Sequence, residues 1–381
     1  MISTILGTIG DTPLITIPNS NRKDEGQVLF KYERYNPGGS IKDRAAMYII
    51  EEAERRGLLK PGGTIIESSS GNFGISLAMI GAAKGYRVII LVDPKTTSSN
   101  LALLKSFGAE VIVVTEKDDC GSYHKTRISL ANKLAREIDN AYRPDQCFNL
   151  LNSEAHYKST AREIVDACSG RLKVFITAVS TGGQLGGISR YLKAFAPEVQ
   201  VIGVDAVGSA IFGGHSESYR IPGVGLGWTP VNVNMELVDC AYKITDEQAF
   251  LTARAFARHE GILIGPSSGA CALVALKAAQ SLGPDDRIVC MIADGGERYI
   301  HTLFNDEWME QQGFATYADM TTIRSMAAQL EPWSERPASQ ANYQGELASS
   351  LEVPDSTLRM NAELMAVGRG HSGQASSLYI D

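Results

Sequence analysis

Short runs of β-branched and other apolar residues alternate along this chain with stretches of helical periodicity, and this alternation restricts the fold more than any other feature. Strands are expected over 28–32, 64–67, 87–92, 111–114, 174–177, 199–204, 262–264 and 287–292. Helices are expected over 41–57, 72–84, 97–107, 122–138, 153–168, 183–195, 245–258 and 268–281. Single strands separated by helices of about 10–15 residues favour parallel sheets with helices on both faces. The sequence therefore predicts an α/β protein.

The alternation falls into two blocks that meet near residue 150. Because a domain usually holds about 100–200 residues, the 381 residues suggest two α/β domains. From about residue 321 the alternation fades, and the segment 321–381 holds four Arg, no Lys and seven acidic residues. We expect this segment to be an appended tail, in part helical and in part disordered.

Charge and composition exclude several classes of function. The net charge of −7 disfavours nonspecific binding to nucleic acid or to an anionic membrane. No apolar run approaches the roughly 20 residues of a membrane-spanning helix, and no secretory signal is expected at the N-terminus. The six cysteines form no Cys-x-x-Cys pair and the histidines form no metal-binding spacing. We therefore expect reduced thiols, a cytoplasmic location and no metal.

The first candidate functional loop is Asn36–Arg44, which places Lys42 in the first turn of a helix. A cation at a helix N-terminus is disfavoured by the helix dipole, so this position lowers the pKa of the amine. A lowered pKa is what an amine that forms a Schiff base requires. The alternative is a surface lysine beside Asp43 and Arg44.

Three more Gly- and Ser-rich loops stand at predicted strand-to-helix junctions, where parallel sheets bind ligands. Ser68–Gly74 offers hydroxyls and N–H groups to a carboxylate, or it forms a helix cap and a tight turn. Ser180–Gly187 is suited to one phosphate group. Gly265–Ala270 carries a serine that caps a helix or bonds a ligand nitrogen. Together with Lys42, these loops supply what a pyridoxal phosphate site needs.

In order and spacing, these motifs, with Asp294–Tyr299, resemble the cysteine synthase and cystathionine β-synthase family of fold-type II pyridoxal phosphate enzymes. The resemblance covers roughly residues 1–315. It implies two domains, each with a helix-flanked, mainly parallel sheet. Residues 1–40 and 150–320 would form the large phosphate-binding domain, residues 41–149 a smaller mobile domain, and residues 321–381 a C-terminal extension. The resemblance also implies a homodimer that acts on small amino-acid substrates.

The resemblance implies a role for each matching residue. Lys42 would bind the cofactor covalently and move the substrate α-proton, while Asn72 would bond the cofactor 3′-oxygen and Ser267 its pyridine nitrogen. The phosphate would be held by Ser180, Thr181, Gly182, Gly183 and Gln184, and the substrate carboxylate by Ser69, Ser70, Asn72 and Gln146. A neutral serine at the pyridine nitrogen makes the cofactor a weaker electron sink than an Asp would, which favours β-elimination followed by addition over transamination.

Departures from cysteine synthase point to a different nucleophile. That enzyme typically carries Thr where Phe73 stands and Phe where Cys147 stands, so we expect an acceptor pocket reshaped for something larger than sulfide. The segment Val204–Gly213 also differs from the usual cysteine synthase, and together with the loop Ser68–Gly74 it is similar to the 2,3-diaminopropionate branch of the family, which serves siderophore and antibiotic biosynthesis. The branch implies O-phospho-L-serine as donor, an aminoacrylate, and L-glutamate as nucleophile, giving N-(2-amino-2-carboxyethyl)-L-glutamate and phosphate.

Two alternatives stay open. One is a cysteine synthase that uses O-acetylserine or O-phosphoserine with sulfide, and the other is a catalytically inactive scaffold with the same fold. The phosphoserine hypothesis needs a cation for the leaving dianion. Arg127, in the helix expected over 122–138, is the candidate, with Ser180 as its hydroxyl partner. The alternative is that Arg127 belongs to a solvated helix face.

Overall fold

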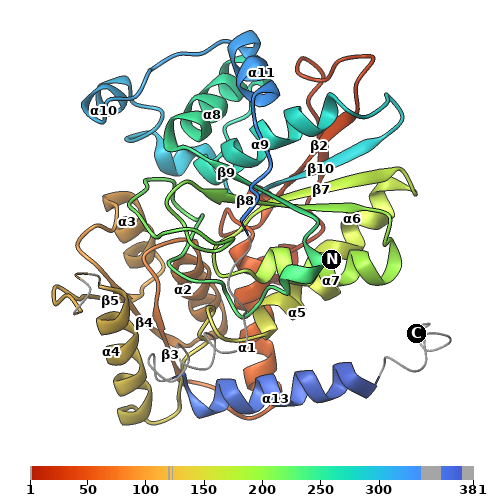
Figure 1. The fold of residues 1–381 in the computed structure, drawn as a ribbon. Coiled ribbons are helices and arrows are strands. Elements are labelled where there is room, and N and C mark those ends of the chain that lie inside the picture. Colours follow the sequence, from red (N-terminus) through yellow and green to blue (C-terminus); the bar gives the residue numbers. More distant parts are fainter. Residues whose placement is uncertain (1, 119–120, 122, 336–352, 371–381) are drawn as a thin grey trace.

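The computed structural model describes residues 2–118, 121, 123–335 and 353–370, and two β-sheets organise it (Figure 1). The large sheet has the strand order β1-β2-β10-β7-β8-β9, and the small sheet has the order β5-β4-β3-β6. Every neighbouring pair is parallel except β1 with β2. The large sheet comprises β1 (Leu14–Thr16), β2 (Gln27–Tyr32), β7 (Leu172–Ala178), β8 (Gln200–Ala206), β9 (Cys240–Ile244) and β10 (Arg287–Ile292). The small sheet comprises β3 (Thr64–Ser68), β4 (Arg87–Val92), β5 (Glu110–Val113) and β6 (Ala141–Tyr142).

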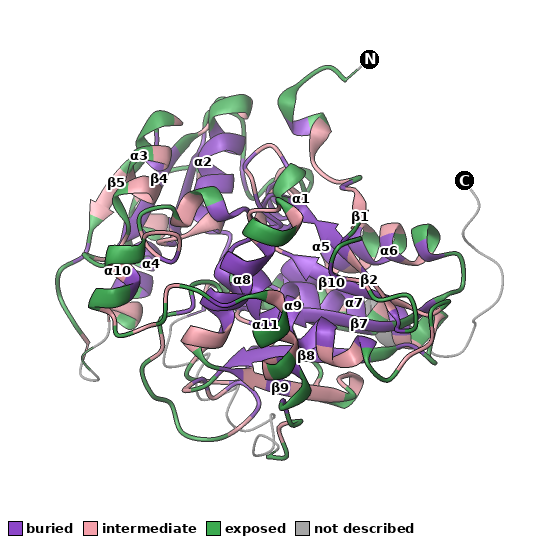
Figure 2. Cartoon of the chain, turned by 90° about the horizontal axis from the view of Figure 1, so that it is seen from above, coloured by how far each residue is buried: buried purple, intermediate pink, exposed green. Residues whose placement is uncertain are grey.

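Helices cover both faces of each sheet, as the sequence predicts for this α/β fold. They are α1 (Lys42–Arg55), α2 (Asn72–Lys84), α3 (Ser98–Ser106), α4 (His124–Glu137), α5 (Leu151–Lys158), α6 (Thr160–Cys168), α7 (Gly183–Phe195), α8 (Asp246–Glu260), α9 (Pro266–Ala279), α10 (Asp306–Gln311), α11 (Met320–Ala328) and α13 (Asp355–Gly370). In β7, Val174 and Ile176 pack in one core with α8 and α9, while Phe175 packs in another with α6 and α7. Figure 2 shows these central strands and α9 buried.

Two of the predicted elements are wrong. The helix expected over 153–168 is two helices, α5 and α6, which meet at Ser159. The Ser159 hydroxyl donates to the carbonyl of Ala155 (2.7 Å) and accepts a hydrogen bond from Arg44 (3.4 Å). The strand expected over 262–264 is a single bridge between Ile264 and Gly295, because helix α9 begins at Pro266 and leaves no room for a longer ladder.

The predicted domain division remains a prediction, but the sheets fall on either side of it. All four small-sheet strands lie within 64–142, whereas the large sheet takes its strands from before and after this segment. Within the predicted extension 321–381, the structure has most of α11 and all of α13, and residues 336–352 and 371–381 lie outside the described part of the chain. No described helix is long and apolar enough to cross a membrane.

Candidate active site

Lys42 is the first residue of α1, and the loop before it is fixed on both sides. Ser40 forms an isolated bridge with Asp294, and the N–H of Ile41 donates to the carbonyl of Ala293 (2.8 Å). These contacts hold the start of α1 against the segment that follows β10. Since β2 leads into the Lys42 loop, the two loops lie side by side at the carboxyl ends of neighbouring parallel strands.

The pKa of Lys42 is lowered, as the sequence predicts, but the leading cause is different. Burial removes water from the amine and lowers its pKa, whereas the negative charge of Asp294 raises it and Cys147 acts in the same direction as Asp294. The sequence predicts the same direction from the helix dipole. The enclosed position gives Lys42 a larger neutral fraction than a surface lysine has.

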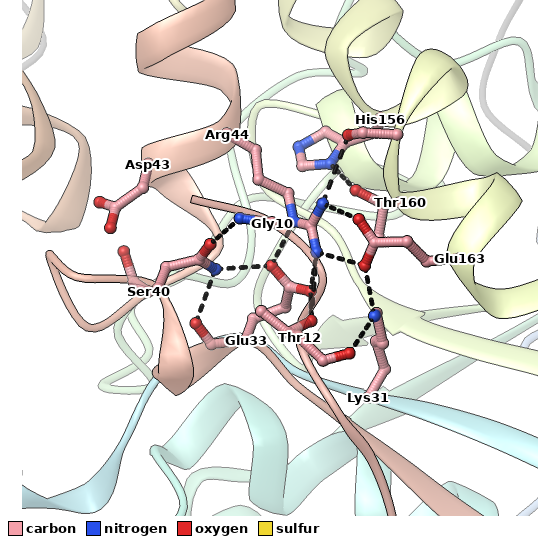
Figure 3. Close-up of polar contacts among 12 residues, drawn as sticks. Gly10, Thr12, Lys31, Glu33, Ser40, Asp43, Arg44, His156, Thr160 and Glu163 are labelled. Atoms are coloured by element: carbon pink, nitrogen blue, oxygen red, sulfur yellow. Dashed lines mark hydrogen bonds and ion pairs between the residues drawn. The ribbon is translucent and has the colours of Figure 1, made fainter. Parts of the chain in front are cut away.

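A network of buried charges surrounds Arg44, two residues after Lys42 (Figure 3). The guanidinium of Arg44 donates to both carboxylate oxygens of Glu33 (2.6 and 2.9 Å) and to Glu163 (2.7 Å). Lys31 on β2 forms a second ion pair with Glu163. Arg44 is 4% exposed and Asp43 is fully buried, so the alternative of a surface lysine beside Asp43 and Arg44 is wrong. The network joins α1, β2 and α6 directly beside Lys42.

Asn72, at the start of α2, is held by residues of the motif Asp294–Tyr299. Its Nδ2 donates to Oδ2 of Asp294 (2.8 Å), and its Oδ1 accepts from Arg298. The hydroxyl of Tyr299 donates to the same Asp294 oxygen (2.7 Å). The other oxygen of Asp294, Oδ1, is buried without a partner, and burial raises the pKa of this carboxyl. The sequence pointed to this motif but assigned no role to Asp294 or Arg298.

In the Ser68–Gly74 loop, at the end of β3, the two predicted carboxylate-binding serines have different hydrogen-bond partners. Ser69 accepts a hydrogen bond from the N–H of Gly74 (3.0 Å), which caps α2 from within the loop. Ser70 instead donates to Asp93 (3.1 Å) and accepts a hydrogen bond from Arg127 (2.5 Å).

Arg127 lies against this loop and is 9% exposed. The alternative that Arg127 belongs to a solvated helix face is therefore wrong. Its guanidinium pairs with Asp93 at 3.2 Å, and its Nε is buried without a partner. Burial lowers the pKa of Arg127, and the charge of Asp93 opposes this shift. Ser180, the partner expected from the sequence, donates its hydroxyl to the carbonyl of Gly225 (3.4 Å).

The predicted phosphate loop joins β7 to α7. The hydroxyl of Thr181 accepts from Nδ2 of Asn152 (3.1 Å). Gly182 has φ +85°, where a side chain would be strained, and a Cβ on Gly183 would lie 1.9 Å from Oδ1 of Asn152. Gln184 turns its Nε2 to Thr177 and Ala178 of β7 (2.7 Å each) and buries Oε1 without a partner.

These features fit the phosphate of the cofactor. The first N–H groups of a helix have no intrahelical acceptor and attract anions, and the two glycines let the loop pass close to Val233 and Asn152 at the start of α7. Asn152 also donates to the carbonyl of Gln146 (2.8 Å). This one side chain therefore connects the phosphate loop with the predicted substrate-binding residue.

We call residues 145–150 the acceptor loop. Its N–H at Asp145 donates to Glu67 (2.7 Å), and the side chain of Asp145 pairs with Arg143 (3.0 Å). Burial raises the pKa of the Cys147 thiol to about 12, with Asp145 and Glu67 acting in the same direction, so the thiol is neutral at neutral pH. Glu67, Asp145 and Asn152 were missed by the sequence reasoning because no motif marks them.

Phe73 does not have the position that the sequence argument gave it. It is 1% exposed and belongs to the core between the small sheet and helices α1 and α2. Its bulk therefore fills that core, and the argument for a reshaped acceptor pocket depends on Cys147.

Ser267 is buried in the first turn of α9. The residue before this helix, Gly265, would place a Cβ 1.9 Å from Oδ1 of Asp294. Gly265 is also the N-cap of α9, so Ser267 is not the capping residue.

Five cysteines are described as free thiols, and Cys120 lies outside the described residues. Within that same part of the chain, no group of three or more His, Cys, Asp or Glu side chains could hold a metal ion.

Comparisons with known proteins cover most of the chain. A family model described as "Pyridoxal-phosphate dependent enzyme" matches residues 5–294. The chain is 42% identical to a probable cysteine synthase of Bacillus subtilis over 77% of its own length and 94% of that protein. It is 39% identical to cystathionine β-synthase of Oryctolagus cuniculus over 84% of its length, but spans only 59% of that protein. The crystal structure of O-ureido-L-serine synthase superposes with a TM-score of 0.74 at 32% identity, over 81% of this chain and 99% of that one.

Proposed function

The chain belongs to the pyridoxal phosphate-dependent enzymes of the cysteine synthase family, and on this basis we propose that it transfers the aminocarboxyethyl group of O-phospho-L-serine to L-glutamate. Enzymes of this family depend on pyridoxal phosphate and catalyse β-replacement. The observation that carries the finer proposal is the buried cation of Arg127 beside the Ser68–Gly74 loop, because it suits a leaving group with two negative charges.

In the proposed β-replacement, the described residues have different roles. When bound, the cofactor withdraws electrons from the α-carbon of the amino acid, so that the α-proton and the β-substituent can leave and a nucleophile can add. Lys42 has a lowered pKa, so its Nζ accepts and returns a proton at neutral pH more readily than a surface lysine does. Thr181, Gly182 and Gly183 would hold the phosphate of the cofactor.

The remaining predicted site residues would orient the two organic groups. Asn72 keeps one amide hydrogen for the cofactor while the other goes to Asp294. Ser267 would meet the pyridine nitrogen. Ser69, Ser70 and Gln146 would bind the carboxylate of the substrate, and Arg127 reaches this group through Ser70.

Arg127 supports a phosphate leaving group on grounds of charge. Burying a dianion without a partner costs several kcal/mol, and a guanidinium offers it two parallel hydrogen bonds. Asp93 pairs with Arg127, but the Nε of Arg127 is buried without a partner and is left to donate a hydrogen bond to an incoming phosphate oxygen. A donor such as O-acetylserine has no comparable need for a cation.

The nucleophile is argued from the acceptor loop. Cys147 stands where cysteine synthase typically carries Phe, and its thiol is neutral, so it adds space without adding charge. Smaller bulk at this position suits L-glutamate better than sulfide. The second candidate is a cysteine synthase, which is favoured by the 42% identity to the probable cysteine synthase of Bacillus subtilis.

Substrate binding would also close the site. Ser69 and Ser70 lie in the segment 41–149, whereas Thr181 and Ser267 lie in the segment 150–320. A ligand that contacts both would draw them together and exclude water. We further expect a homodimer, which sedimentation would measure.

Mass spectrometry of reaction products tests the proposal. Purified holoenzyme receives O-phosphoserine or O-acetylserine, each with L-glutamate or sulfide. N-(2-amino-2-carboxyethyl)-L-glutamate formed mainly from the phosphoserine and glutamate pair supports the proposal, and cysteine as the main product refutes it. Lys42→Ala is the control: it abolishes turnover and the visible absorbance of the covalently bound cofactor. Normal turnover by this variant would exclude the assigned site, and wild-type protein without cofactor absorbance would favour an inactive scaffold.

A further inference from the structure

Helix α13 packs on the small-sheet side of the molecule, beyond the part of the chain that the family model matches. That match ends at residue 294, and α13 begins at Asp355. Figure 1 shows α13 crossing below α1. Its contacts reach the acceptor loop, which carries Gln146 and Cys147.

Asn361 of α13 holds the end of the acceptor loop through two backbone hydrogen bonds. Its Oδ1 accepts from the N–H of Leu150 (2.9 Å), and its Nδ2 donates to the carbonyl of Phe148 (2.7 Å). One side-chain amide thus satisfies a donor and an acceptor two residues apart. This requires both the oxygen and the nitrogen of an amide, so neither a carboxylate nor an aliphatic side chain can replace it.

The start of the acceptor loop is held by the small-sheet body instead. The N–H of Asp145 donates to Glu67 at the end of β3 (2.7 Å). Asn149 donates to the carbonyl of Pro144 (2.9 Å), which closes the loop on itself. Gln146 and Cys147 lie between this fixed start and the end that Asn361 holds. The carbonyls of Gln146 and Cys147 accept from Asn152 (2.8 Å) and Asn232 (3.2 Å), so Asn361 supplies the side-chain anchor for the end of the loop at Phe148 and Leu150.

Helix α13 is itself anchored firmly enough to act as a support. Met360, next to Asn361, is 1% exposed and belongs to the core that contains residues of α1, α2 and β3. Val353 is buried with Ile128 of α4 and Phe148 of the acceptor loop. Glu363 also pairs with Arg56, directly after α1, but its side chain is 66% exposed and such a surface pair adds little to the anchoring. The segment therefore packs against the helices that begin with Lys42 and that carry Arg127.

We propose that Asn361 is a positioning residue that holds the acceptor loop in the shape that receives the amino-acid substrate. The inference rests on the proposed role of Gln146 and Cys147 in substrate binding. Asn361 acts through the backbone of Phe148 and Leu150 and does not touch the substrate. In this chain the C-terminal extension is thus a part of the active-site architecture.

Binding of L-serine to the pyridoxal phosphate holoenzyme, followed by the change in cofactor absorbance, tests the proposal. Asn361→Leu keeps the size of the side chain but removes both hydrogen bonds, and Asn361→Asp keeps only the bond from Leu150. We expect Asn361→Leu to weaken L-serine binding at least tenfold and Asn361→Asp to weaken it less. The affinity for pyridoxal phosphate itself stays within twofold. The matched control Glu363→Gln, on the same helix, binds L-serine as the wild type does.

Hydrogen exchange of the peptide that spans 145–151 gives a readout independent of activity. Its amides exchange faster in Asn361→Leu and are unchanged in Glu363→Gln. Unchanged exchange, or unchanged L-serine binding despite faster exchange, would overturn the proposal. If Asn361→Leu unfolds, Asn361→Asp decides by the same two measurements. L-Serine needs neither a leaving group nor glutamate, so the result is readable even if no product forms from any donor and acceptor pair.

Discussion

Replacing Arg44 by Met tests whether the buried charge network beside Lys42 holds the start of α1. Methionine keeps most of the aliphatic length but removes the cation. Arg44 donates to Glu33 and Glu163, and the Glu33 side chain is 0% exposed. After the substitution, Glu33 keeps the hydrogen bonds from Thr12 (2.6 Å) and Asn36 (2.8 Å) but loses its ion pair.

The expected loss follows from what remains buried. Removing one partner of a buried ion pair typically costs about 3–5 kcal/mol, because the other charge is left uncompensated. Arg55→Met is the matched control on the same helix. The Arg55 side chain is 64% exposed and pairs with Glu52 three residues earlier, so its loss costs at most about 1 kcal/mol.

Urea unfolding followed by circular dichroism and tryptophan fluorescence measures both variants. The two probes show whether unfolding is a single transition, which a chain with two sheets need not give. Equal losses in Arg44→Met and Arg55→Met would refute the electrostatic reasoning. The double variant Arg44→Met with Glu33→Gln should be more stable than Arg44→Met alone, because the unpaired charge is gone. A double variant that loses the sum of both single losses would also count against it.

Three further predictions concern pH, the phosphate loop and the donor. Burial raises the pKa of Glu163, but hydrogen bonds and charges from its two buried cationic partners outweigh this and lower the pKa to about 2. Its contribution to stability is thus complete above its ordinary pKa of 4.5 and is lost as the pH falls towards 2. Between these pH values, the free energy of unfolding of Glu163→Gln should depend less on pH than that of the wild type, which urea unfolding at a series of pH values measures. Gly183→Ala should weaken pyridoxal phosphate binding at least tenfold in cofactor titrations, since its Cβ would meet Asn152 at 1.9 Å, whereas Gly283→Ala, with its nearest atom at 3.6 Å, should bind normally. Arg127→Ala should lower kcat/KM for O-phosphoserine at least tenfold, about 1.4 kcal/mol, and for O-acetylserine much less; equal losses on both donors would contradict the assigned role.

The elements that the sequence predicts best are those whose residues are buried on both faces. Val88–Val92 is a continuous buried apolar run, and β4 has the predicted bounds Arg87–Val92. The break between α5 and α6 could not be predicted, because the Ser159 hydroxyl bonds both its own helix and Arg44, which is 115 residues away in sequence. The isolated bridge at Ile264 likewise depends on a partner from another part of the chain.

Within the candidate site, the residues that the sequence can identify are those that belong to short local motifs. Lys42 and Thr181 lie in short Gly- and Ser-rich motifs whose chemistry is visible in the sequence alone. Asp93, Asn152 and Asn361 stand in no such motif. Their importance comes from tertiary neighbours, such as the 211 residues that separate Asn361 from Leu150. Periodicity and composition carry no information about such pairs.

The pairing of β2 with β10 affects how the chain folds while it is being translated. Gln27 pairs with Arg287 and Tyr32 with Ile292, so about 260 residues separate the two strands. At roughly 5–20 residues per second, translation takes about 13–50 s to cover that distance. The small sheet can assemble within this interval, since all its strands lie between Thr64 and Tyr142. Until β10 is made, β2 lacks its parallel neighbour, and such an unpaired strand edge is a site where another chain can add.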